Sequence, residues 1–81
     1  MEPITISMNG YSMTIKEETL RDMVGGLVLP RNNLMSHPLV TPYGRYLGGF
    51  HDEWRWDLYA LRKAPLTHIL AIINLIDKEK P

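Results

Sequence analysis

Alternating apolar and polar residues flank Asn9-Gly10, and this stretch constrains the fold more than any other part of the chain. Asn-Gly favours a two-residue turn because both of its residues readily adopt positive φ, and such a turn sets the register of the strands on either side. The register predicts three apolar pairs: Met8 with Tyr11, Ile6 with Met13, and Ile4 with Ile15. We therefore expect a β-hairpin over residues 3–15 whose apolar face packs on helices or on a third strand, because an isolated hairpin is only marginally stable.

A short helix is predicted over residues 16–25. Thr14 and Glu17 have the spacing of a capping box, in which the two side chains satisfy free backbone N–H groups at the helix start. Leu20, Met23 and Val24 form an apolar stripe with helical spacing, and Gly25-Gly26 provides a stop. A helix of this length is unstable alone, so it must pack against the hairpin.

The segment from His51 to Ala64 is interpreted as a helix over residues 52–63, with Asp52 as its N-cap and Pro65 after its end. At about 100° per residue, this helix carries two apolar faces. The first contains Trp54, Leu58 and Leu61, and the second contains Trp56, Tyr59 and Ala60. The first face requires a core. The second requires a folded-over loop, a second subunit or another partner.

The last predicted helix covers residues 65–78 and is apolar over an arc of roughly 220°, more than the 100° or so that a surface helix needs. It is therefore the centre of the core or is shared with another copy of the chain, and we expect a homodimer. The very short link at Ala64-Pro65 predicts that the two C-terminal helices form an antiparallel pair, as a helical hairpin or a corner.

Residues 27–50 are rich in proline and glycine and are expected to form a loop with short strands. Leu27–Leu29 is a candidate third strand ended by Pro30, and Tyr43–Leu47 is a candidate edge strand. A connection of this length without structure is unusual in a compact domain, and this one is too apolar for a solvated linker. Some of its side chains are expected to pack on the second face of the 52–63 helix.

Length and composition fit one small α+β domain over residues 1–81. Nine basic residues balance nine acidic ones, which argues against non-specific nucleic-acid binding as the main activity. There is no cysteine, so disulfides and thiolate metal sites are excluded. The chain shows no signal peptide and no apolar run long enough to cross a membrane, which predicts a cytoplasmic protein.

Motifs for catalysis or cofactor binding are absent from the sequence. It has no phosphate-cradling loop, dinucleotide glycine motif, zinc-protease motif or nucleophile elbow. His37, His51 and His68 lack metal-ligand spacing, and a glycine-rich anion site at Gly48-Gly49 is disfavoured because Asp52 and Glu53 follow it. We expect no enzyme activity, no cofactor and no metal.

The leading hypothesis is a non-catalytic protein-binding module that regulates or inhibits a larger assembly, as small accessory or phage-encoded proteins often do. Its predicted contact residues are aromatic or arginine, the types enriched at binding hot spots. They are Trp56, Tyr59, Arg55 and Arg62, with Tyr43, Arg45 and Tyr46 from the loop. One alternative is a small-molecule binder that stacks aromatic side chains on a planar, nucleotide-like ligand and holds its anionic group with Arg45 or Arg55. A second alternative is a single-stranded nucleic-acid binder.

Overall fold

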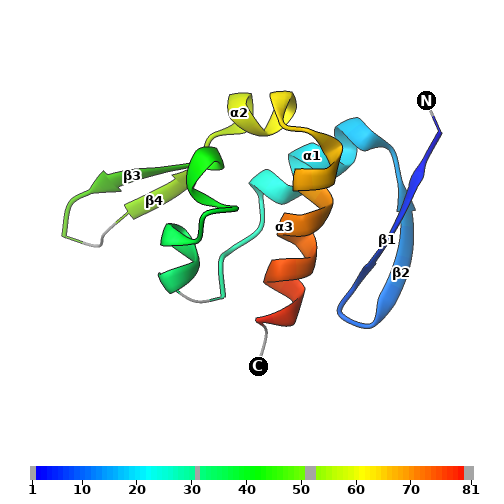
Figure 1. Cartoon of the computed structure of the whole chain (residues 1–81), viewed down its shortest axis with the longest axis horizontal. Helices are drawn as coiled ribbons and strands as arrows, with labels where there is room; N and C mark the ends of the chain where they lie inside the picture. Colours follow the sequence, from blue (N-terminus) through cyan, green and yellow to red (C-terminus); the bar gives the residue numbers. More distant parts are fainter. Residues whose placement is uncertain (1, 31, 51–52, 80–81) are drawn as a thin grey trace.

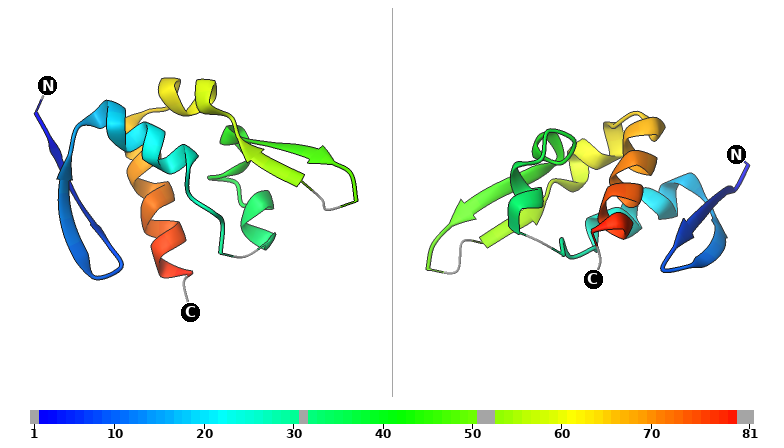
Figure 2. Two further views of the ribbon diagram at one scale, coloured as in Figure 1. Left: turned by 180° about the vertical axis from the view of Figure 1, so that it is seen from behind. Right: turned by 60° about the horizontal axis from the view of Figure 1, so that its bottom comes forward.

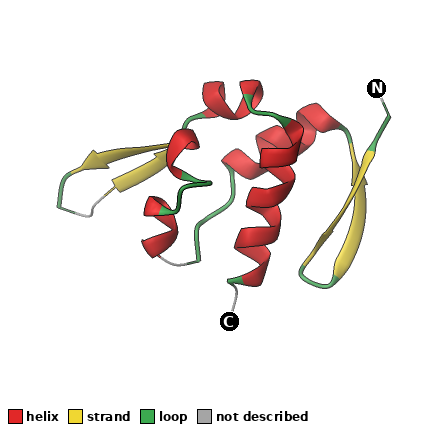
Figure 3. Cartoon of the chain, viewed as in Figure 1, coloured by secondary structure: helices red, strands yellow, loops and turns green. Residues whose placement is uncertain are grey.

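The computed structural model describes residues 2–30, 32–50 and 53–79. Two strand pairs lie at opposite ends of an elongated molecule, and the helices lie between them (Figures 1 and 3). The fold class is α+β, with an N-terminal hairpin and a C-terminal helix, as the sequence predicted.

The N-terminal hairpin consists of β1 (Ile4–Met8) and β2 (Tyr11–Ile15), and all the predicted pairs are present. Asn9 has φ of 56° and Gly10 has φ of 80°, as the two-residue turn requires. The apolar face is covered unevenly, however. Ile6 and Met8 on β1 are buried against the core, whereas Tyr11 and Met13 on β2 are exposed.

Helix α1 (Glu17–Gly25) follows the hairpin directly, and Leu20 and Val24 are its fully buried residues. The predicted capping box is wrong. The N-cap is Lys16, with no side-chain cap, because Thr14 remains within β2 and its hydroxyl lies 3.2 Å from that of Thr5 on β1. The strand therefore continues past the position at which the capping box would have begun the helix.

Helix α3 (Leu66–Lys78) forms the centre of the core, which is one of the two alternatives that its wide apolar arc indicated. Four of its isoleucines are at most 1% exposed: Ile69, Ile72, Ile73 and Ile76. They pack with α1, with β1 and with Leu61 of α2 (Leu58–Lys63). The chain changes direction at Ala64-Pro65, so α2 and α3 meet at a corner (Figure 1), and the more extensive packing of α2 is on α1.

The predicted helix over residues 52–63 is wrong in its first half. Strand β4 (Glu53–Trp56) occupies that half, and only Leu58–Lys63 are helical. Asp57 is the N-cap, and its side chain accepts a hydrogen bond from the Ala60 N–H at 3.1 Å. Asp52, the expected N-cap, lies outside the described residues. A helix with two apolar faces is therefore replaced by a strand followed by a helix, with Trp54 and Trp56 on the strand.

Strand β4 pairs with β3 (Gly44–Gly48), which corresponds to the strand predicted at residues 43–47. Positive φ at Gly48 and Gly49 turns the chain between the two strands, with a register irregularity next to the turn. The candidate third strand at 27–29 is not a strand, and two short 3-10 helices, η1 (Asn32–Ser36) and η2 (Thr41–Tyr43), shape the rest of the connection.

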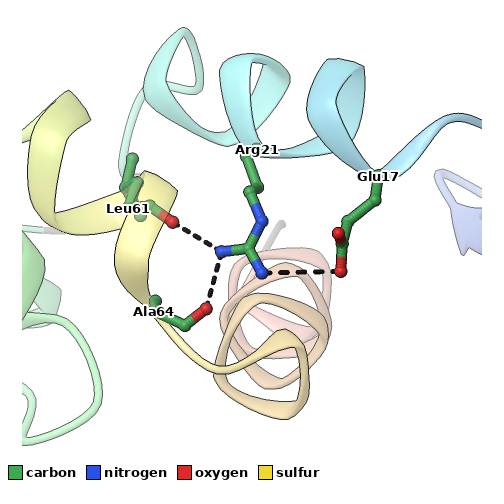
Figure 4. A network of polar contacts seen from close by, with 4 residues as sticks. All are labelled: Glu17, Arg21, Leu61 and Ala64. Carbon is green, nitrogen blue, oxygen red and sulfur yellow. Dashed lines mark hydrogen bonds and ion pairs between the residues drawn. The ribbon is translucent and has the colours of Figure 1, made fainter.

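Arg21 of α1 holds the end of α2 in place (Figure 4). Its Nη1 donates to the carbonyl oxygen of Leu61 at 2.7 Å and to that of Ala64 at 2.6 Å. Glu17 lies 3.5 Å from its other terminal nitrogen. The last carbonyls of a helix lack their usual helical donors, and Leu61 otherwise accepts a 3.3 Å bond from the Ala64 N–H. One guanidinium therefore adds a donor to each carbonyl and fixes the corner between α2 and α3.

Among residues 2–30, 32–50 and 53–79, no helix has the length and apolar character needed to span a membrane.

Candidate interaction surface

Strands β3 and β4 form an arm that extends away from the helices (Figures 1 and 2). We call residues 44–50 and 53–56 the β3–β4 arm. Residues directly opposite each other in an antiparallel pair lie on the same face, and successive residues alternate between faces. The register pairs Gly44 with Trp56, Tyr46 with Trp54, and Arg45 with Arg55. The arm therefore has one aromatic face and one arginine face.

The aromatic face is built around Trp54 and Trp56. Their ring centroids are 4.8 Å apart in an edge-to-face arrangement, which suits the quadrupoles of two indoles. Trp54 packs directly over Gly44 of the opposite strand, where a Cβ atom would overlap its ring. The absence of a side chain at position 44 therefore lets the Trp54 ring lie against the sheet.

Trp56 joins the arm to the body of the protein. Its Nε1 donates to the carbonyl oxygen of Leu27 at 2.8 Å, and its ring packs against the core cluster. An open groove of about 500 Å³ lies between the two indoles and the extended segment Leu27–Leu29, with Met35 also in its wall. Trp56 is therefore an anchor that forms part of the groove.

Exposed apolar side chains gather at the outer part of the arm. Phe50 is fully exposed, Tyr46 is 63% exposed and Leu47 is 52% exposed. Val28, at the edge of the groove, is 86% exposed. Single exposed apolar residues are ordinary, but several of them together on one two-stranded arm are typical of a binding surface.

On the arginine face, the positive charges of Arg45 and Arg55 are each paired with an acidic side chain. Arg45 and Arg55 lie opposite each other, an arrangement that is unfavourable for two like charges. Arg55 forms an ion pair with Glu53 at 2.7 Å, and the Nε of Arg45 lies 3.4 Å from a carboxylate oxygen of Asp57. Each arginine thus has its own acid, and both guanidinium groups stay largely exposed.

The predicted contact residues separate into groups in the structure. Arg45, Tyr46, Arg55 and Trp56 lie together on the arm. Tyr43 is buried, and its hydroxyl lies 2.6 Å from Nδ1 of His68, so it supports the base of the arm. Tyr59 and Arg62 lie on α2: Tyr59 is exposed beneath the Lys63 ammonium, and Arg62 pairs with Asp22 of α1.

Sequence reasoning missed Trp54, Leu47 and Phe50 as candidate contact residues. Trp54 was assigned to the core face of a helix, Leu47 to the end of a candidate edge strand, and Phe50 to the loop. The available signal was the Gly48-Gly49 pair between two apolar segments, which is typical of a hairpin. With that hairpin, Trp54 and Trp56 occupy alternate positions and share one face.

The histidines take structural roles where the structure describes them. His37 Nδ1 accepts from the Leu39 N–H at 3.1 Å, and His68 bonds Tyr43. His51 lies outside the described residues. Within residues 2–30, 32–50 and 53–79, no group of three or more metal-ligating side chains comes together. No helix follows Gly48-Gly49 directly, because β4 begins at Glu53, so the helix N-terminus that an anion site there needs is missing.

Comparison of the chain with protein-family models, with curated proteins and with solved structures finds no match.

Proposed function

We propose that the chain is a small non-catalytic protein-binding module and that the aromatic face and turn of the β3–β4 arm contact its partner. The observation that carries this proposal is the exposure of Tyr46, Leu47 and Phe50 together on the outer part of the arm, whose two tryptophans also line an open groove. Side chains that stay exposed to water contribute little to the stability of a two-stranded arm. Their burial against a partner would remove apolar surface from water, which is the main favourable term in most protein association.

The chemistry of the arm suits a protein partner. Tryptophan, tyrosine and arginine are the side chains most enriched at binding hot spots, and the arm contains all three. Arg45 and Arg55 lie on the opposite face from the indoles, where they would form the polar rim around an apolar centre. A module of this kind would act by occupying a surface of a larger assembly, as a regulator or an inhibitor.

The test is affinity capture from native lysate with the wild-type chain and with a triple variant, Tyr46→Ser, Leu47→Ser and Phe50→Ser. We expect the wild type to retain specific proteins that the triple variant loses. Tyr11→Ser is the matched control, because Tyr11 is also exposed but lies on β2 at the other end of the molecule. Capture that is unchanged by the triple variant, or lost with Tyr11→Ser, would contradict the proposal.

A small-molecule binder is the second candidate, and the observation that favours it is the groove itself. Its volume of about 500 Å³ lies within the usual range of about 300–1,000 Å³ for ligand sites. The groove is open, and the charged side chain in its lining, Arg55, is already paired with Glu53. Thermal shift against a nucleotide panel separates the two functions: stabilisation by one nucleotide would favour this candidate.

Single-stranded nucleic-acid binding receives less support from the arrangement of the arm. Such proteins stack bases on aromatic rings that lie beside a positively charged path for the backbone. Here the aromatic rings and the arginines lie on opposite faces, and each arginine has an acidic partner.

A further inference from the structure

The outer edge of β1 is an open strand edge with no charged residue along it. In a hairpin with a two-residue turn, Met8 and Tyr11 exchange hydrogen bonds, and every second pair after them does the same. The backbone N–H and C=O groups of Thr5 and Ser7 therefore point away from β2. No hydrogen bond between described residues reaches these groups, and β1 and β2 form a sheet of only two strands.

Within Ile4–Met8, after Pro3, this edge lacks the features that usually protect a free strand. Natural proteins block edges with charged residues, prolines or bulges. The β3–β4 arm has such features, with Arg45, Glu53 and a register irregularity. Strand β1 has the sequence Ile-Thr-Ile-Ser-Met, which is uncharged and regularly paired.

The notch beside this edge is lined by uncharged residues, and the nearby carboxylate of Asp77 accepts a hydrogen bond from the Asn9 N–H at the hairpin turn. This notch of about 200 Å³ separates β1 from α3 and is lined by Thr5, Ile6 and Ser7 on one side and by Leu70, Ile73 and Asn74 on the other. Thr67, Leu70 and Asn74 form a stripe with helical spacing along the less buried side of α3, and none of them is ionised. An added strand would cover the notch and lie against this stripe.

The other edge of the hairpin offers no such support. On β2 the apolar side chains Tyr11 and Met13 already extend beyond the core, so a strand added there would have no helix to pack on. Helix α3 packs on β1 (Figure 2), so a strand added at β1 would share that helix.

We propose that two copies of this chain associate through their β1 edges to form one continuous four-stranded antiparallel sheet. A two-fold axis at Ile6 places Thr5 opposite Ser7 of the second copy, so the outward-pointing groups of both residues face partners. Each such pair exchanges two hydrogen bonds, and symmetry doubles the number. The same axis brings the uncharged stripes of the two α3 helices toward each other and leaves both β3–β4 arms free.

Sedimentation equilibrium of the full chain tests this interface with two proline variants. Thr5→Pro removes an N–H from the β1 edge. Thr14→Pro is the matched control, because it removes the same Thr5–Thr14 hydroxyl contact and an N–H from the β2 edge. We expect a wild-type dimer, a Kd raised about tenfold or more by Thr5→Pro, and a Kd within about twofold of wild type for Thr14→Pro. A wild-type chain that is monomeric at about 500 µM, or equal effects of the two variants, would overturn the proposal.

Amide hydrogen exchange of the wild type provides a second measurement that needs no variant to fold. Free edge amides exchange quickly, and hydrogen-bonded amides exchange slowly. Between about 5 µM and about 500 µM, exchange at Thr5 and Ser7 should slow by about tenfold or more, while Ser12 and Thr14 should change little. Unchanged exchange at Thr5 and Ser7 over this range would reject the β1 interface.

Discussion

At the scale of single residues, Arg21 and Arg62 provide a comparison of two arginines that both connect α1 and α2. The Arg21 side chain is 13% exposed and donates two short hydrogen bonds to the last carbonyls of α2. The Arg62 side chain is 64% exposed and lies 3.6 Å from Asp22. Burial and helix-end acceptors distinguish the first contact from the second, although both join the same two helices.

Replacing Arg21 should therefore cost far more stability than replacing Arg62. Arg21→Met keeps most of the apolar stem but removes the guanidinium donor from the carbonyls of Leu61 and Ala64, and Leu61 then keeps only its 3.3 Å bond from the Ala64 N–H, so we expect a loss of about 2–3 kcal/mol in unfolding free energy. Arg62→Met should cost less than about 1 kcal/mol, because exposed ion pairs contribute little. Urea unfolding of both variants measures this difference. Equal losses would show that Arg21 does not secure the corner.

Single residues also show where sequence reasoning succeeds. Asn9-Gly10 correctly predicted a complete hairpin register, because the turn and the alternation specify the same pairs and no distant contact is needed. The exposure of Tyr11 and Met13 could not be predicted in the same way. It depends on where α3 lies across the sheet, and that position is set by packing far away in the sequence.

At the scale of elements, the incorrect helix over residues 52–63 has a physical explanation. Trp54, Leu58 and Leu61 have helical spacing, but Trp54 and Trp56 also have the alternation of a strand. Pairing with β3 decides between the two, since strand preference depends strongly on neighbouring strands. The local spacing of apolar residues does not indicate whether a strand partner lies some ten residues away along the chain. Four members of the predicted contact set lie on the arm, and Trp54, which that set omits, lies there as well.

Trp56 and Tyr59, which the helical interpretation placed on one face, are expected to differ in their contribution to stability. Trp56→Ala removes a packed indole and its hydrogen bond to Leu27, so it should cost about 3 kcal/mol or more. Tyr59→Ala should cost less than about 1 kcal/mol, because that side chain is exposed on α2. Denaturant unfolding of the two single variants checks this. Similar losses would argue against the assignment of Trp56 as the anchor of the arm.

At the scale of the whole molecule, the core and the surplus apolar surface occupy different places. The isoleucines of α3 are enclosed by the chain itself, which corresponds to the first of the two alternatives offered for this helix, the centre of the core. The exposed large apolar side chains lie on the β3–β4 arm, on β2, at Val28 and on α2. The two proposed contacts, at the β3–β4 arm and at the β1 edge, lie at opposite ends of the molecule (Figure 1).

The unfolding free energy of the Tyr46→Ser, Leu47→Ser and Phe50→Ser triple variant tests most directly whether the fold uses these arm residues. We predict a value within about 1 kcal/mol of wild type, because exposed side chains contribute little to folding. A loss of about 3 kcal/mol or more would mean that the isolated chain already buries these side chains, and the arm would then be part of the core and not a surface kept for a partner.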